Sequence, residues 1–221
     1  SATITLDVSD NVEQWDDKSG NVRHGTQTTS AKRPGYDATL GEVIYSDFEH
    51  ALIIPGWSSG NDHNLFAVVD QQGTGALEGV LVAGSGLSVT SDLLFFATRA
   101  NLGSNVGWYD GNWRRIASTI TGNQLLQWSF IGSTGTIYRN AADLGSNSYN
   151  GRSMQNTVAL GEWVDDSDSS TRGFKGRIKE VVLISGAVTA TIKEKMEGYL
   201  AHKWGLEASL PSGHPYKNSP P

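Results

Sequence analysis

The chain contains no cysteine and no long apolar run among its 221 residues. The absence of cysteine excludes disulfides, thiolate zinc sites and cysteine nucleophiles. The longest uncharged run, residues 116–138, includes the polar, turn-forming segments Thr121–Gln124 and Gly132–Gly135, which do not fit a membrane-spanning helix. Ser1 is not followed by the basic and apolar regions of a signal peptide. We therefore expect a soluble chain without a signal peptide or membrane insertion.

Positive charge is also scarce. The chain has 17 Lys and Arg residues against 23 Asp and Glu, which gives a net charge of -6. A nucleic-acid-binding protein needs a basic surface, so this balance argues against nucleic acid as a partner. It also leaves the chain without a polybasic membrane anchor.

Glycine is abundant instead. The 26 glycines are about 12% of the chain, above the usual ~7%. With glycine added, the hydrophobic fraction of 38% becomes ordinary for a globular protein, so the excess indicates many turns rather than disorder. Neither a linker-like segment nor an internal repeat divides the sequence. We expect a single domain over residues 1–221.

The hydrophobic pattern predicts strands through most of the chain. Residues 2–8 alternate polar and apolar side chains with a period of two, which is typical of a half-buried strand. Asp110-Gly111 is flanked by aromatic residues and predicts a tight hairpin. Together these features favour an antiparallel sandwich or barrel. Seven short apolar runs, bounded by turn-forming residues, are the other expected strands: 43–45, 51–54, 65–69, 80–82, 93–96, 125–131 and 178–184.

One segment near the C-terminus has helical periodicity. Apolar residues recur every three or four positions from about 189 to 204. Thr189 is the better N-cap candidate, although Thr191 with Glu194 also fits a capping box. Gly205 is placed to end the helix in the left-handed conformation. The Pro-rich tail, residues 206–221, is predicted to run extended over the body of the protein.

Both ends of the chain carry motifs of a known family. Residues 12–21, followed by His24, Gln27 and Arg33-Pro34, resemble the opening of LamG-like domains of the concanavalin A-like lectin/glucanase superfamily. Later segments resemble the last inner strand and the C-terminal signature of that family: residues 174–181, 197–206, 210–211 and 214–217. The resemblance implies an all-β, antiparallel jelly-roll β-sandwich with one C-terminal α-helix. Such modules are common in phage virion proteins and in secreted bacterial proteins.

The sequence departs from the family pattern at three places. Ser46–Glu49 stands where family members usually have Phe-Asp-Gly, and Ile192 replaces an acidic residue. Ala141 stands where a glycine is expected after Asn140. Residues 57–130, where ligand loops would lie, carry little of the family pattern. The resemblance therefore predicts the fold, and a ligand site has to be argued from individual side chains.

Catalytic motifs are missing from the sequence. Retaining glucanases of this fold use a strand motif of the form Glu-x-Asp-x-x-Glu or Glu-x-Asp-x-Glu, which the chain lacks. A nucleophile elbow, a His-Glu-x-x-His motif and a phosphate loop are absent as well. Asp47 and Glu49 form the nearest acidic pair, which a strand would point the same way, but two solvated edge residues are the simpler explanation. We predict a protein that is not an enzyme.

Aromatic residues mixed with polar ones offer two candidate ligand sites. The apolar C–H face of a sugar ring stacks on Trp or Tyr, while Asn, Asp and Arg bind its hydroxyl groups. A loop at residues 57–63 and a hairpin tip at residues 108–115 have this mixture. The alternative is that the aromatic side chains pack in the core, because aromatic residues also favour strands. The candidate ligand-binding residues are Trp57, Asn61, Asp62, His63, Trp108, Tyr109, Asn112, Trp113 and Arg114.

One dense acidic loop, residues 162–170, suggests a cation site. Calcium takes six to eight oxygen ligands, often from Asp side chains in loops, and some LamG-like domains bind it. The candidate ligands are Asp165, Asp166 and Asp168, and a solvated loop is the alternative. We expect no required cofactor, with calcium as the one candidate. Three histidines in or beside the family motifs are expected to be hydrogen-bonded structural groups: His24, His202 and His214.

These observations predict a non-catalytic binding or adhesion module. The leading hypothesis is a bacteriophage virion-surface protein, a tail fibre or capsid decoration, that recognises glycan or protein on a host cell surface. A purely structural virion or cell-surface assembly protein without a sugar site is the alternative, and a glycoside hydrolase or lyase is the third hypothesis. Other virion proteins are expected partners, at a virion surface or in the extracellular space. A homo-oligomer fits that setting, although no sequence feature defines an oligomer interface.

Overall fold

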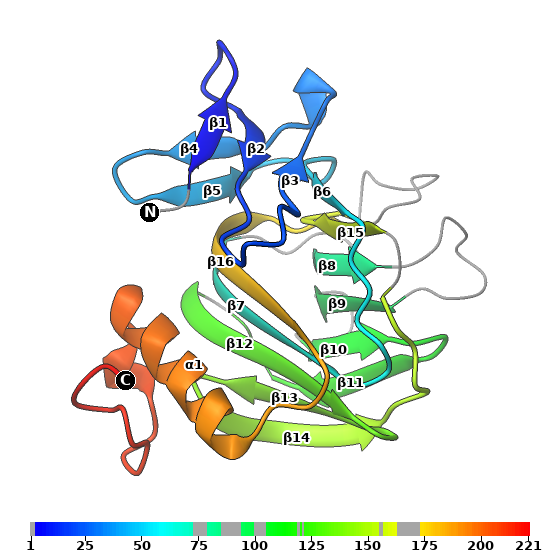
Figure 1. The fold of residues 1–221 in the computed structure, drawn as a ribbon, viewed down its shortest axis with the longest axis vertical. Helices are drawn as coiled ribbons and strands as arrows, with labels where there is room; N and C mark the ends of the chain where they lie inside the picture. Colours follow the sequence, from blue (N-terminus) through cyan, green and yellow to red (C-terminus); the bar gives the residue numbers. More distant parts are fainter. Residues whose placement is uncertain are drawn as a thin grey trace.

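Two antiparallel β-sheets pack face to face in the computed structural model (Figure 1). The structure describes residues 3–72, 79–84, 94–99, 105–118, 120, 122–154, 157–162 and 173–221. Sheet A has the strand order β1 (Ile4–Leu6), β2 (Val12–Trp15), β3 (Gly25–Thr26), β6 (Leu52–Pro55), β15 (Thr157–Leu160), β8 (Gly79–Gly84), β9 (Leu94–Arg99), β10 (Asn105–Tyr109) and β11 (Trp113–Ala117). Sheet B has the order β14 (Ala142–Ser148), β13 (Thr134–Arg139), β12 (Gly122–Ile131), β7 (His63–Gln71), β16 (Gly176–Ser185), β5 (Glu42–Tyr45) and β4 (Gly35–Asp37). The predicted antiparallel sandwich is confirmed.

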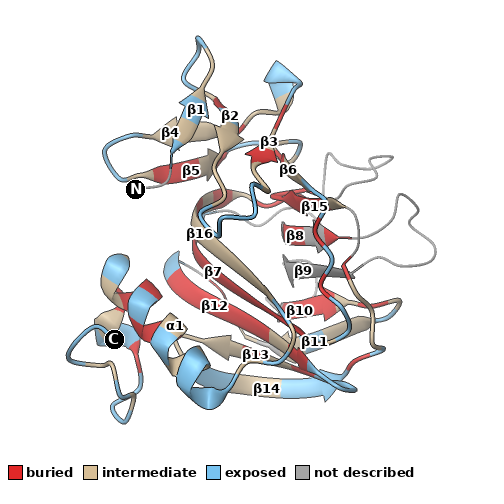
Figure 2. Ribbon diagram, viewed as in Figure 1, coloured by how far each residue is buried: buried red, intermediate tan, exposed pale blue. Residues whose placement is uncertain are grey.

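The core lies between the inner faces of the two sheets. Figure 2 shows β7 and β12, the central strands of sheet B, as the most buried part of the sandwich. Trp108 from sheet A and Trp128 from sheet B are fully buried and are the largest side chains inside. The Trp128 Nε1 atom donates a hydrogen bond across the core to the carbonyl oxygen of Gly107 at 3.1 Å. A Cβ at Gly135 would lie 2.6 Å from the Trp108 ring, so this glycine makes room for the indole.

A single α-helix, α1 (Ala190–Lys203), is found among the described residues. The Thr189 side chain accepts a hydrogen bond from the backbone N–H of Ile192 at 3.3 Å, which confirms Thr189 as the N-cap. Gly205 has a φ of 68°, the left-handed conformation predicted for the end of the helix. In the described part of the chain, no helix has the length and apolar character needed to span a membrane.

The helix covers the outer face of sheet B (Figure 1). Outward-facing Phe66, Val68 and Leu125 form a second apolar cluster with Leu200 and Ala201 of the helix. An apolar sheet face exposed to water is unfavourable, and burying a side chain such as Leu200 against it contributes about 1.5–3 kcal/mol. The helix therefore buries the outer apolar face of sheet B.

The C-terminal tail, which was predicted to run extended, instead follows the helix through short turns. A 3₁₀ helix spans Glu207–Ser209, and backbone hydrogen bonds close turns at residues 211–214 and 214–217. Residues 204–221, all of which are described, contain no further α-helix or β-strand, as the prolines predict. Leu206 and Leu210 are buried in the cluster beneath the helix, so the tail is anchored to the body of the protein.

The predicted strands are all present, but β2, β3, β4, β15 and the whole β13–β14 hairpin were not predicted. Strands β13 and β14 are joined by the two residues Asn140 and Ala141, whose φ values are 49° and 66°. Left-handed conformations at both central positions are what a type I′ turn requires, and glycine adopts them more readily than alanine. This is the physical reason that the family pattern has glycine where this chain has Ala141. The hairpin escaped prediction because its residues are mostly small, polar and half-exposed.

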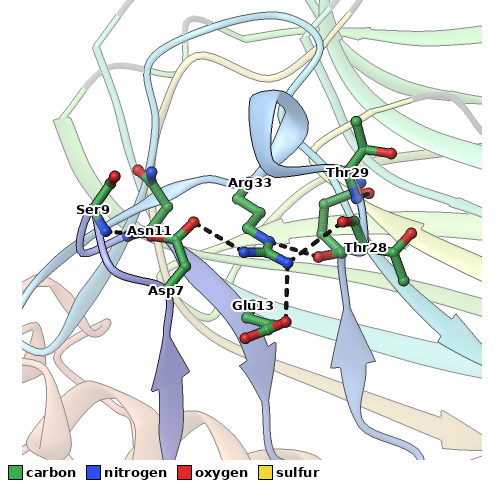
Figure 3. A network of polar contacts seen from close by, with 8 residues as sticks. Asp7, Ser9, Asn11, Glu13, Thr28, Thr29 and Arg33 are labelled. Carbon is green, nitrogen blue, oxygen red and sulfur yellow. Dashed lines mark hydrogen bonds and ion pairs between the residues drawn. The ribbon is translucent and has the colours of Figure 1, made fainter.

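A polar network secures the N-terminal strands of the sandwich (Figure 3). The Arg33 guanidinium binds the Asp7 carboxylate at 3.0 Å, the Glu13 carboxylate at 2.9 Å and the Gln27 carbonyl oxygen at 2.8 Å. Backbone N–H groups, that of Asn11 first, together with Arg33 hold the pKa of Asp7 below its usual value. Each charged side chain of this network has a partner within the fold, so we assign the network a structural role.

Candidate functional site

Three of the predicted ligand-binding residues lie inside the sandwich. Trp57, His63 and Trp108 have exposed fractions of 6%, 0% and 0%. All of them adjoin the main core, and Trp108 points inward from β10 onto Phe130, with ring centroids 5.2 Å apart. A buried side chain has no surface to offer a ligand. We therefore remove these three residues from the candidate site.

The hairpin of β10 and β11 presents two other aromatic side chains on its outer face. Its register pairs Trp108 with Arg114 and Tyr109 with Trp113. Because neighbouring residues of a strand point to opposite faces, Tyr109 and Trp113 point away from the core. Both are half-buried, and their rings meet edge to face with centroids 5.8 Å apart. We call Tyr109 and Trp113 the aromatic pair.

The turn of this hairpin is built around a buried carboxylate. Asp110 is 0% exposed and accepts hydrogen bonds from Trp108 Nε1 at 3.3 Å and from the backbone N–H of Asn112 at 3.3 Å. The backbone N–H of Asn150 donates to it at 3.0 Å, and the Arg114 Nε atom lies 3.5 Å away. Arg114, a predicted ligand residue, thus neutralises Asp110. These contacts hold the turn in one conformation and leave Asn112 exposed at its tip.

A third loop, residues 149–154, joins the two predicted segments. The backbone N–H of Ser59 donates to the Met154 carbonyl oxygen at 2.9 Å, and Ser59 Oγ accepts from the Met154 N–H at 2.8 Å. At its other end the loop contacts the hairpin turn through Asn150 and Asp110. The predicted loop and the predicted hairpin tip therefore meet at one end of the sandwich. The sequence analysis did not identify this third loop, although Asn150-Gly151 is a turn-forming dipeptide that pointed to it.

Polar side chains from all three loops surround the hairpin tip. The Arg152 guanidinium packs over Gly111, where an added Cβ would lie 2.6 Å from its Nη2 atom. The amide nitrogen of Asn61 is 3.9 Å from the corresponding Cβ position at Gly151. Asn61 and Asn112 are exposed and Arg152 is half-buried, so the tip offers neutral and cationic hydrogen-bonding groups to the solvent.

Asp62 holds the first loop in place. Its Oδ1 atom accepts a hydrogen bond from the backbone N–H of Gly132 at 2.8 Å, and its backbone carbonyl accepts one from Gly186 at 2.7 Å. Asp62 is half-buried. Asp62, a predicted ligand residue, therefore links its own loop to the turns at Gly132 and Gly186 at the same end of the molecule.

Beneath the loops, two titratable side chains are kept uncharged. His63 packs between Phe130 and Tyr149, with ring centroids 4.9 Å and 6.0 Å away. Burial lowers the pKa of His63 to about 4, so the imidazole is neutral at physiological pH. Burial, together with the charges of Asp110 and Asp62, raises the pKa of Tyr149. His63 thus supports the loops by packing rather than by contacting a ligand.

The predicted calcium ligands Asp165, Asp166 and Asp168 lie outside the described residues, and calcium binding there stays a prediction. Within the described part of the chain, no group of three or more His, Asp and Glu side chains could hold a metal ion.

The acidic pair Asp47 and Glu49 lies in a turn rather than on a strand. Strand β5 ends at Tyr45, and the Asp47 carboxylate accepts a hydrogen bond from the backbone N–H of Glu49 at 3.2 Å. Both side chains are exposed. The strand geometry that would point them the same way is absent at this position.

The three motif histidines are structural, as predicted. They are hydrogen-bonded within the fold to Asp17, Tyr216 and Glu197, in the order His24, His202 and His214.

Solved structures share this fold at low sequence identity. Trypanosoma rangeli sialidase in complex with sialic acid has a TM-score of 0.62 and 12% identity, over 91% of this chain and 33% of the sialidase. Domain 4 of AbnA, a GH43 extracellular arabinanase from Geobacillus stearothermophilus in complex with arabinotriose, has a TM-score of 0.52 and 17% identity, over 68% of this chain and 73% of that one. The native heptameric SAP-like pentraxin from Limulus polyphemus has a TM-score of 0.50 and 10% identity, over 71% of this chain and 75% of the pentraxin chain.

These likenesses confirm the predicted jelly-roll β-sandwich with one helix. This chain spans about a third of the sialidase, 33% of its length. No protein-family model matches the sequence, nor does any curated protein. The comparisons therefore define the fold class. The chemical class of any ligand has to be inferred from the geometry of the site.

Proposed function

We propose that the protein is a non-catalytic module that binds glycan through the aromatic pair. The observation that carries this proposal is the contrast within one hairpin: Trp108 fills the core, whereas Tyr109 and Trp113 form a half-buried platform on the outer face of sheet A. Trp108 is part of the core, whereas Tyr109 and Trp113 make contacts within the fold and still keep part of their surface exposed. Aromatic rings at a surface offer the apolar face on which the C–H side of a sugar stacks.

Polar groups at the same end of the sandwich could bind the hydroxyl groups of a stacked sugar. Asn112 is exposed at the hairpin tip, Arg152 packs over the turn, and Asn61 comes from the neighbouring loop. Glycan sites combine such an apolar surface with a few placed hydrogen-bonding groups. Because Asp110 and the loop 149–154 fix the turn, little conformational entropy would be lost on binding.

The sequence motifs support a setting for this activity. The resemblance of residues 12–21 and 197–206 to LamG-like domains favours a module on a bacteriophage virion surface or outside a cell. Host-surface glycan and other virion proteins would be its partners there. The proposed binding requires no cofactor. Calcium at Asp165, Asp166 and Asp168 is tested by thermal unfolding with calcium and with a chelator, where bound calcium would raise the melting temperature.

Glycan-array binding tests the proposal. The wild-type protein should bind a subset of glycans, and Trp113→Ala and Tyr109→Ala should each weaken that binding about 10-fold or more, because stacking on an aromatic ring is lost. Tyr199→Ala on helix α1 is the matched control, since this exposed tyrosine lies on the opposite side of the sandwich. No binding above background, or unchanged binding by Trp113→Ala, would contradict the proposal.

A purely structural assembly protein is the second candidate function. The burial of Trp57, His63 and Trp108 favours it, because three of the predicted ligand residues serve the core instead. Under this alternative no glycan binds, and removing the aromatic pair alters association with a protein partner only.

We also propose that the protein is not an enzyme, so bound glycans should yield no new reducing ends on prolonged incubation.

A further inference from the structure

Arg115 places a positive charge on the same face as the aromatic pair. It lies two residues beyond Trp113 on β11, about 7 Å along the strand. The register pairs it with Gly107, so its side chain points outward as that of Trp113 does. Arg115 is exposed and, among the described residues, has no hydrogen-bond or ion-pair partner. Its neighbour Arg114, in contrast, lies 3.5 Å from the Asp110 carboxylate.

The position opposite Arg115 carries no side chain. A Cβ at Gly107 would collide with the carbonyl oxygen of Arg114, so this position accepts only glycine without a backbone shift. Gly107 also lies two residues before Tyr109 on β10. No side chain of β10 therefore stands opposite Arg115, although the Gly107 backbone itself is buried.

A guanidinium in this place suits an anion. Its planar fork binds carboxylate and sulfate oxygens with two parallel hydrogen bonds, which are stronger than bonds between neutral groups. The protein as a whole carries a net charge of -6, so an acidic ligand is not attracted by the overall charge and needs a local cation. Arg115 supplies that cation within the width of one sugar ring from Trp113, because the two side chains are neighbours on one strand face.

We propose that the glycan bound here is acidic. Its sugar ring would stack on the aromatic pair while its carboxylate or sulfate group binds Arg115. This inference rests on the proposed glycan-binding function and adds the chemical class of the ligand and the residue that selects it.

Paired acidic and neutral probes test the inference. Binding is measured on a glycan array with neutral, carboxylated and sulfated members, and by calorimetry with tetragalacturonate against its methyl ester and dextran sulfate against dextran. The wild-type protein should prefer the acidic member of a pair, and salt should weaken that preference. Arg115→Gln should lose about 10- to 100-fold in affinity for the acidic probe and little for neutral sugar, because a charged hydrogen bond is removed. Arg115→Lys should retain part of the preference.

Lys195→Gln on helix α1 is the matched control for charge, since Lys195 is exposed on the opposite side of the sandwich. It should bind as the wild type does. Preference for the carboxylated or the sulfated probe identifies the acidic group, and either result supports the inference.

Equal binding of acidic and neutral glycans, or an acidic preference that survives Arg115→Gln, overturns the inference that Arg115 selects an acidic glycan. Either result leaves the proposed glycan binding intact. Absence of binding to every glycan overturns both.

Discussion

The two faces of the β10–β11 hairpin hold tryptophans with opposite roles. Trp108, on the inner face, meets Phe130 edge to face and donates its indole hydrogen bond to the buried Asp110. Trp113, on the outer face, pairs with Tyr109 and is half-buried. The two tryptophans belong to one short aromatic segment, yet one is part of the core and the other is the proposed contact for a ligand.

The difference is set by strand register rather than by residue type. A turn of residues 110–112 separates the strands, so Trp108 stands opposite Arg114 and Tyr109 opposite Trp113. A turn longer or shorter by one residue would move one of the strands to the other face. Under the proposed function the inner face accounts for stability and the outer face for binding, so the two roles should respond separately to mutation.

The largest expected effect is on the inner face. Trp108→Ala should lower the free energy of unfolding by about 3–5 kcal/mol, because it removes the indole and leaves a cavity against Phe130 and Gly135. Urea denaturation followed by circular dichroism measures this change. Trp108→Phe should be less damaging, since the ring partly refills the site. A loss below about 1 kcal/mol for Trp108→Ala would contradict the assignment of this face to the core.

Acid should weaken the layer under the loops through His63. Burial depresses its pKa from 6.5 to about 4, so between these values the unfolded chain binds a proton that the folded protein does not. The contribution of neutral His63 to the free energy of unfolding is therefore fully present above pH 6.5. It is lost as the pH falls toward 4, and the total loss is ~3 kcal/mol.

Urea denaturation across this pH range measures the effect of His63. His63→Gln should flatten the pH dependence of the unfolding free energy. The pKa of His50 is also lowered by burial, so a smaller slope should remain. A slope equal to that of the wild type in His63→Gln would contradict the assignment.

Asp110→Asn should have an intermediate effect, because the turn links the two faces. The amide keeps the size of the side chain but offers one acceptor oxygen in place of two, and it removes the charge beside Arg114. We expect a loss of about 1–3 kcal/mol in unfolding free energy, measured by denaturation. Asp10→Asn is the control, since that aspartate is exposed and outside any core contact, and it should change stability by no more than about 0.5 kcal/mol.

The smallest effect on stability belongs to the outer face. Trp113→Ala should cost about 1 kcal/mol, the typical worth of a surface aromatic pair, while the melting transition stays cooperative. Differential scanning calorimetry measures it beside Tyr199→Ala, an exposed aromatic residue on the helix. A loss as large as that of Trp108→Ala would mean that the aromatic pair belongs to the core, and would erase the contrast between the two faces.

Most of the fold could be predicted because its determinants are local. Period-two alternation identified β1, short apolar runs identified the central strands β7, β12 and β16, and Thr189 and Gly205 marked the ends of the helix. The β13–β14 hairpin lacks an apolar run, and its turn at Asn140-Ala141 departs from the usual Asn-Gly. Local patterns do not detect such an element.

The site was only partly predictable because it depends on contacts between distant residues. The sequence identified the hairpin and the loop 57–63, but the loop 149–154 that joins them is held by hydrogen bonds to Ser59 and Asp110, far away along the chain. The sequence also suggested ligand contacts for both hairpin tryptophans. Once the strand register is known, the alternation of side chains assigns Trp108 to the inner face and Trp113 to the outer face. That register is a property of the folded hairpin.

The most direct test of the central claim follows the seven tryptophan indole N–H signals by NMR during titration with a glycan that binds on the array. The indole signal of Trp113 should shift in a saturable manner, while those of the buried Trp108 and Trp128 stay in place. Shifts confined to the other tryptophans, with Trp113 unmoved at saturation, would contradict a glycan site on the outer face of the hairpin.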